Sequence, residues 1–84
     1  MRHATATDLD RLEPLLRRLR NLTGLKEKSR GTFYRGSRAF LHFHADGAAL
    51  YADIRTGEEF ERVAVTTTAQ KKALLTMIGH ALSK

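Results

Sequence analysis

Apolar residues recur at helical spacing in the first quarter of the chain. The apolar stripe there consists of Leu9, Leu12, Leu15, Leu16, Leu19 and Leu22. A recurrence every three or four residues predicts an amphipathic helix. Because Pro14 fits the first turn of a helix better than its interior, we expect the regular helix to begin near Asp10. Gly24 is suited to its C-terminal cap, and residues 1–7 are expected to form a loose N-terminal tail.

Apolar and polar residues alternate in the middle of the chain, which predicts β-strands. The strongest hairpin signal is Asp46-Gly47, which lies between the alternating runs at residues 38–45 and 48–55. Asp-Gly is typical of a two-residue type I′ turn. If these two residues form the turn, His42 lies directly opposite Tyr51 on the neighbouring strand.

Shorter patterns on both sides of this hairpin complete the predicted sheet and add a second helix. Residues 32–34 can begin a strand that turns at Gly36-Ser37, and residues 60–65 form another strand. Whether residues 32–34 pair as a full strand stays open at this point. Thr67 and Gln70 have the spacing of a capping box, which predicts a helix start. The buried stripe of that helix would be Leu74, Leu75, Ile78, Ala81 and Leu82.

Together these elements predict a single α+β domain spanning residues 1–84. The expected fold has two layers in the order α-β-β-β(-β)-α, with an antiparallel meander sheet and both helices on one face. Alternation assigns a group of apolar strand residues to the covered face: Leu41, Phe43, Leu50, Ala52 and Ile54. The open face would carry an unusual mixture of aromatic, histidine and charged residues: Phe40, His42, His44, Tyr51, Asp53, Arg55, Phe60 and Arg62.

Charge is distributed unevenly along the chain. The net charge is +6, from 15 Lys and Arg against nine Asp and Glu, and the excess lies in the first 38 residues. Such asymmetry indicates a polyanionic partner, which could be RNA, DNA or an acidic protein. The leading functional hypothesis is therefore a binding module rather than an enzyme. The residues expected to contact the polyanion are Arg17, Arg18, Arg20, Lys26, Lys28, Arg30, Lys71 and Lys72.

Composition excludes several other classes of protein. The chain has no cysteine, so it has neither disulfides nor a cysteine-based zinc site. No apolar run approaches the ~20 residues of a membrane span, and the first residues lack the apolar stretch of a signal peptide. We therefore expect a cytoplasmic protein with no membrane partner.

A histidine pair on the open face is the main alternative source of chemistry. Alternation places His42, His44 and Asp46 on one face of a strand, where they could reach one metal ion. Since any H-x-H pair on a strand has this geometry and Asp46 already serves the turn, the sequence favours a partly exposed histidine pair. It predicts no metal and no cofactor.

Two further hypotheses involve the same open face. A histidine beside a tyrosine and a carboxylate can perform acid–base chemistry, and His42, Tyr51 and Asp53 have that arrangement. The alternative function is therefore a small hydrolase or metal site around His42, His44 and Asp53. Alternatively, an exposed aromatic patch that includes Phe40, Tyr51 and Phe60 could form a protein-interaction surface or a homodimer interface.

The arrangement of elements resembles two known families. Lys71-Lys72-Ala73 at the start of the last helix resembles double-stranded-RNA-binding domains, which implies that the lysine pair contacts phosphates across the RNA grooves. Gly36-Ser37 before a strand is similar to HicA-type mRNA interferase toxins, which implies RNA cleavage by a histidine in that strand. Residues 40–44 and 51–55 also resemble a group of small bacterial proteins of unassigned function, which implies a fold but no activity.

Overall fold

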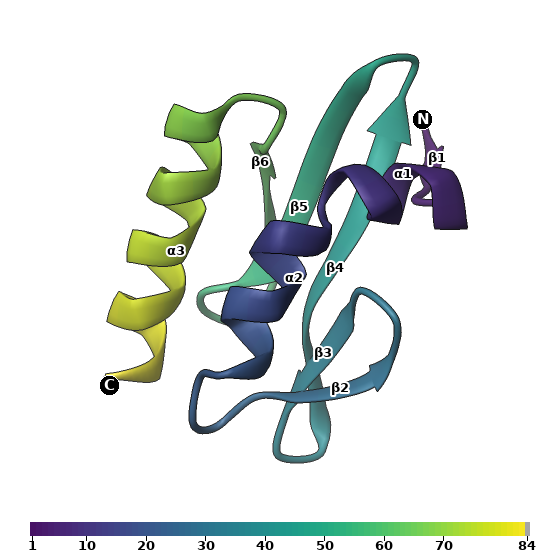
Figure 1. The fold of residues 1–84 in the computed structure, drawn as a ribbon. Helices are drawn as coiled ribbons and strands as arrows, with labels where there is room; N and C mark the ends of the chain where they lie inside the picture. Colours follow the sequence, from purple (N-terminus) through teal and green to yellow (C-terminus); the bar gives the residue numbers. More distant parts are fainter. Residues whose placement is uncertain (84) are drawn as a thin grey trace.

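The computed structural model describes residues 1–83 as three helices packed on one face of an antiparallel sheet (Figure 1). The elements in chain order are β1 (Arg2–His3), α1 (Ala6–Arg11), α2 (Glu13–Arg20), β2 (Lys26–Ser29), β3 (Thr32–Arg35), β4 (Arg38–Asp46), β5 (Ala49–Arg55), β6 (Phe60–Ala64) and α3 (Thr68–Leu82). The strand order is β2-β3-β4-β5-β6, and β1 also pairs with β4. The predicted two-layer α+β fold is confirmed. Within the described residues, no helix is long and apolar enough to cross a membrane.

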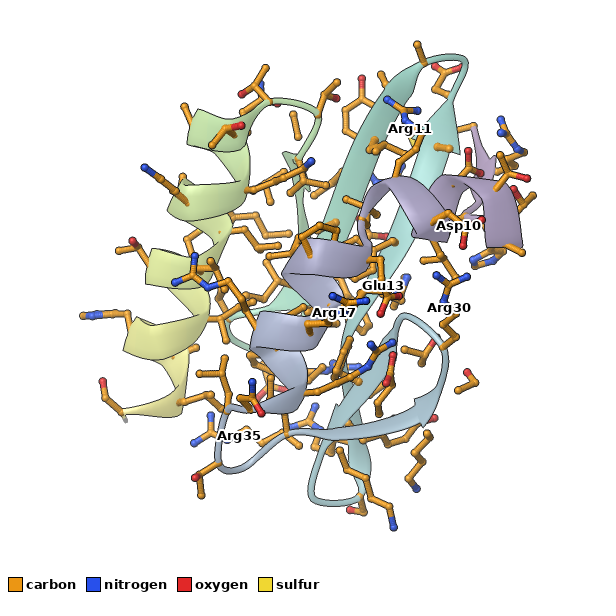
Figure 2. The ribbon with its side chains drawn as sticks, in the orientation of Figure 1. Asp10, Arg11, Glu13, Arg17, Arg30 and Arg35 are labelled. Carbon is orange, nitrogen blue, oxygen red and sulfur yellow. The ribbon has the colours of Figure 1, made fainter. Side chains whose placement is uncertain are left out.

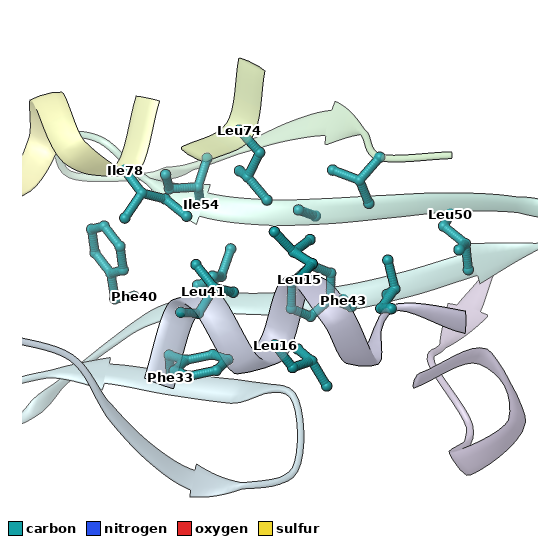
Figure 3. Close-up of a cluster of buried hydrophobic side chains, with 14 of the residues drawn as sticks. Leu15, Leu16, Phe33, Phe40, Leu41, Phe43, Leu50, Ile54, Leu74 and Ile78 are labelled. Atoms are coloured by element: carbon teal, nitrogen blue, oxygen red, sulfur yellow. The ribbon is translucent and has the colours of Figure 1, made fainter. Parts of the chain in front are cut away.

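The hydrophobic core lies between the sheet and the helices (Figure 3). The five strand residues predicted for the covered face are each at most 3% exposed. Helix α3 contributes Leu74, Ile78 and Ala81, and it begins at the predicted capping box, where Thr67 and Gln70 bond each other's backbone N–H. Both the covered face and the second helix are therefore confirmed.

The first residues of the chain do not form a loose tail, so this prediction is wrong. Arg2 and His3 pair with the end of β4, and the N–H of Ala4 donates to the carbonyl of Phe43 at 3.1 Å. Thr5 then caps α1 through a reciprocal capping box with Asp8. Because the chain is held on both sides of Ala4, the N-terminal segment is an ordered part of the sheet.

The predicted first helix is two helices. The first, α1, begins at Ala6 rather than near Asp10, and the turn at Leu12 separates it from α2. Pro14 lies in the first turn of α2, where a backbone N–H would have no acceptor within the helix, so the N–H that proline lacks costs no hydrogen bond. The proline therefore marks a helix start, as expected, but of the second helix.

The central hairpin has a different register from the predicted one. His42 pairs with Asp53 rather than Tyr51, because the loop residues are Gly47 and Ala48 instead of Asp46 and Gly47. Gly47 takes the first loop position at φ +59°, where glycine meets no steric penalty. A type II′ turn requires glycine at this first position alone. The shift moves each partner by two residues, so both faces of the sheet keep their residues.

Phe40 is the one aromatic residue predicted for the open face that lies elsewhere. Phe33 pairs with Leu41 whereas Tyr34 pairs with Ala39, which leaves Phe40 as an extra residue in a β-bulge. A bulge redirects a side chain relative to the regular alternation. Phe40 is 3% exposed and belongs to the core, where Figure 3 shows it near Ile78.

Residues 26–29, for which the sequence predicts no strand, form β2. It pairs with β3, which extends from Thr32 to Arg35 as a full strand. Gly31 closes the turn between them at φ +82°. An added Cβ there would lie 2.7 Å from Cδ2 of Leu9, so the turn packs closely against α1.

Candidate metal centre

Three histidines gather on the open face of the sheet. His42 and His44 belong to β4, and His3 of β1 is the direct cross-strand partner of His44. One ring nitrogen from each histidine lies within 4.8 Å of the others. Nδ1 of His42 and Nε2 of His44 are within hydrogen-bond distance of each other, at 3.1 Å. The rings of His3 and His44 have centroids 4.6 Å apart.

The two strands bring these side chains together for different reasons. Strand alternation places His42 and His44 on one face, as the sequence predicts. His3 arrives through the pairing of β1 with β4, which sequence reasoning missed because it treated residues 1–7 as a tail. The signal that could have found it is the capping-box spacing of Thr5 and Asp8, which would have ordered the chain before α1.

Asp53 of β5 adds a carboxylate to the cluster. It is the cross-strand partner of His42 and is only 7% exposed. Its Oδ2 lies 3.0 Å from Nε2 of His44 and 3.9 Å from Nδ1 of His42. Arg62 of β6 holds both carboxylate oxygens, with Nε and an amino group donating at 2.7 and 2.9 Å. The carboxylate is therefore fixed beside the histidine nitrogens.

The surroundings favour an ionised carboxylate and a neutral imidazole. Hydrogen bonds from Arg62 lower the pKa of Asp53, against the opposing effect of burial. Burial lowers the pKa of His42, although the nearby Asp53 charge acts in the other direction. These are the protonation states in which carboxylates and imidazoles bind metal ions.

The remaining open-face residues surround the cluster. Tyr51 is the cross-strand partner of His44, and Phe60 packs against His42 in an edge-on arrangement with centroids 4.8 Å apart. The Arg55 guanidinium lies over Phe60 at 4.3 Å and donates to the carbonyl of Ala39. With Asp53 and Arg62, these side chains form the predicted open face without Phe40.

Asp46 does not take the place that the sequence suggested for it. It pairs with Ala49 beside the hairpin loop and is exposed. It is not among the residues whose ligand atoms gather around His42 and His44. The third potential ligand is thus His3, from another strand, instead of the next alternate residue of β4.

Three of the eight basic residues predicted to bind a polyanion form ion pairs with carboxylates: Arg17, Arg20 and Arg30. Figure 2 labels Arg17 and Arg30 beside Glu13. Glu13 of α2 accepts hydrogen bonds from Arg20 at 2.7 Å and from Arg30 at 2.9 Å. These two guanidinium groups lower the pKa of the Glu13 carboxyl to about 2. Arg20 also bonds Glu27, and Arg17 lies 3.6 Å from Glu13. The charge of these three arginines is therefore largely neutralised.

The other basic residues separate into two places. Lys26 and Lys28 lie on β2, where the Lys28 ammonium sits 4.3 Å from the centre of the Tyr34 ring. Arg18, Lys71 and Lys72 line a common groove between α2 and α3. The structure therefore brings together three of the eight residues and does not form one continuous basic surface from all of them.

No protein-family model, curated protein or solved structure matches this chain. The chemistry that the open face can support is therefore inferred from the geometry of its side chains alone. Imidazole nitrogens suit zinc, copper and nickel, and three protein ligands leave a coordination position for water in the manner of catalytic zinc sites.

Proposed function

We propose that this protein binds a divalent transition-metal ion of the zinc class through His3, His42 and His44. The observation that carries this proposal is the convergence of three imidazole nitrogens within 4.8 Å from two strands. Any solvated polar residues would suit an open sheet face, so solvent exposure alone does not explain why three histidines cluster there. A bound ion would give them a common function.

The distance between two of the three nitrogens is close to that expected around a tetrahedral ion. With Zn–N distances of about 2.0–2.1 Å, tetrahedral geometry separates neighbouring ligand nitrogens by roughly 3.3 Å. Nδ1 of His42 and Nε2 of His44 are 3.1 Å apart. His3 completes the set from the exposed side, and because its side chain is solvent-accessible it can close on an arriving ion.

Asp53 contributes charge beside the proposed ion. Its carboxylate, held by Arg62, offsets part of the positive charge that a divalent ion brings to a half-buried site. With three protein nitrogens bound, the ion retains a position for water, whose pKa falls when it binds zinc. Hydrolytic chemistry at that water is the second candidate function, and the Asp53 carboxylate, 3.0 Å from Nε2 of His44, favours it as a hydrogen-bond acceptor that would orient the water.

Isothermal titration calorimetry with Zn²⁺ tests the proposal. We expect one ion per chain and a loss of affinity greater than about 100-fold in His42→Ala, since removing even an outer partner of a ligand costs about 10- to 100-fold. His80→Ala is the matched control, because His80 lies exposed on α3, away from the cluster. Circular dichroism verifies that each variant folds.

The proposal fails if the wild type binds no more zinc than the folded His42→Ala variant. It also fails if His80→Ala lowers the affinity as much as His42→Ala does. The hydrolytic candidate fails separately if the zinc-loaded protein cleaves no member of a panel of activated phosphate and carboxylate esters.

A further inference from the structure

A groove between α2 and α3 carries an unbalanced positive charge. It is about 300 Å³ in volume, and its walls come from both helices. The lining residues are Pro14, Leu15, Arg18, Thr68, Lys71, Lys72 and Leu75. A second hollow shares Arg18, Lys72 and Leu75 and continues along α3 to Thr76. The two hollows form one open surface along the neighbouring helices, which we call the α2–α3 groove.

The cations of this groove differ from the other basic residues near α2. None of the residues that line the two hollows is acidic, and α3 contains neither Asp nor Glu. Within residues 1–83, the side chains of Arg18, Lys71 and Lys72 have no ion-pair or hydrogen-bond partner. By contrast, Arg20 and Arg30 are each held by carboxylates. Positive charge is therefore balanced next to the groove and unbalanced within it.

The position of the lysines reinforces this potential. Lys71 and Lys72 lie near the N-terminal end of α3, where the helix dipole is positive and cations are unfavourable. Arg18 faces the same groove from α2. An anion in the groove would offset the charges of all three side chains and the positive end of the α3 dipole. The arrangement therefore favours an anionic ligand.

We propose that the α2–α3 groove binds the phosphate backbone of a nucleic acid. The groove is open and continues into a second hollow, so it suits a polymer better than a single enclosed phosphate. The guanidinium of Arg18 can hold one phosphate through two hydrogen bonds, and the two lysines act as point charges. The net charge of +6 steers a polyanion toward the protein.

This site is separate from the histidine cluster. The groove lies in the helical layer, whereas His3, His42 and His44 lie on the opposite, open face of the sheet. Binding through phosphate contacts has no sequence preference and weakens steeply with salt, because each neutralised phosphate releases counterions. It also requires no metal, so it is measured in the presence of a chelator.

Fluorescence anisotropy with a labelled single-stranded RNA of about 20 nucleotides tests the proposal at salt concentrations between about 50 and 200 mM. The groove variant is Lys71→Gln/Lys72→Gln. Its matched control is Lys26→Gln/Arg38→Gln, which removes the same charge from exposed positions outside the groove. We expect the slope of log K against log salt to decrease in magnitude by about 1.4 in the groove variant, from about 0.7 per lost contact. The slope in the control should barely change.

Three outcomes would overturn the proposal. The first is no RNA binding at the lowest salt concentration. The second is an equal loss in the two double variants, which would indicate diffuse attraction by net charge. The third is equally tight binding of poly-glutamate of similar length, which would assign the groove to an acidic protein instead. A loss confined to the groove variant, with RNA preferred over poly-glutamate, supports it.

Discussion

The two faces of the central hairpin follow the same alternation and hold different chemistry. On the covered face, Leu41 and Phe43 of β4 are buried against the helices. On the open face, His42 and His44 of the same strand meet His3 and a carboxylate. The covered face is specified by apolar volume, which many side-chain combinations can supply. The open face instead depends on specific hydrogen-bond partners. Within the described residues, every buried side-chain nitrogen or oxygen atom has a hydrogen-bond partner.

The largest expected effect comes from truncating one aromatic side chain on each face of the sheet and comparing the losses in the free energy of unfolding. Phe43→Ala leaves a cavity in the core and should lower the free energy of unfolding by about 3–5 kcal/mol. Phe60→Ala, on the open face, should cost clearly less because Phe60 is only half-buried. Urea denaturation measures both. Equal losses would contradict the distinction between a face defined by volume and a face defined by partners.

The second prediction tests whether the open face depends on its partners. Asp53→Asn keeps the shape of the side chain and removes its charge, so zinc affinity should fall by about 10- to 100-fold. Asp46→Asn is the control, since Asp46 is exposed beside the hairpin loop and lies outside the cluster. Competition with a fluorescent zinc chelator gives both affinities. An unchanged affinity in Asp53→Asn would show that the carboxylate plays no part in metal binding.

A third prediction concerns the edge of the covered face, where the β2–β3 turn packs on α1. Gly31→Ala introduces a Cβ 2.7 Å from Cδ2 of Leu9 at a positive φ. The left-handed backbone conformation costs a non-glycine residue about 1–2 kcal/mol. Because the contact with Leu9 adds to this cost, thermal or urea unfolding should show a loss of at least that size. Gly57→Ala, with open space around it and no positive φ, should change stability by less than about 0.5 kcal/mol.

The smallest expected effect is a pH dependence from the open face. Burial lowers the pKa of His42 from its ordinary value of 6.5, so the folded protein binds this proton less tightly than the unfolded chain does. The contribution is fully present above pH 6.5 and is lost as the pH falls through the lowered pKa. Urea midpoints of the metal-free protein at pH 5, 6 and 7 should rise with pH. His42→Gln should flatten that rise, and an unchanged slope would assign it to other groups.

The sequence predicted the covered face and the capping box at Thr67 because both depend on local spacing. It could not choose the register of the central hairpin, since a shift of two residues leaves each face unchanged. The actual loop follows from the preference of Gly47 for the first loop position at positive φ. The alternation of residues thus determines which face of the sheet each side chain occupies, whereas the stereochemistry of the turn determines which residues pair across the two strands.

The candidate site was predictable only in part. His42, His44 and Asp53 share the open face by alternation, so they were found. His3 requires the pairing of β1 with β4, a contact between residues about 40 positions apart. The capping-box spacing of Thr5 and Asp8 indicates an ordered segment before α1 but does not identify the strand that pairs with it. Phe40 was misplaced because a bulge changes the alternation at a single residue. Such a bulge allows two adjacent residues, here Phe40 and Leu41, to be buried on the same face, so two neighbouring apolar residues are its sign in the sequence.

The most direct test of the metal centre is to observe all four histidine side chains at once. A long-range ¹H–¹⁵N NMR spectrum of the imidazoles, recorded while Zn²⁺ is added, reports which ring nitrogens bind the ion. We predict that His3, His42 and His44 shift together and saturate at one ion per chain, while His80 stays unchanged. If the four histidines shift alike and without saturation, or if none shifts, the three-histidine centre is not a metal site.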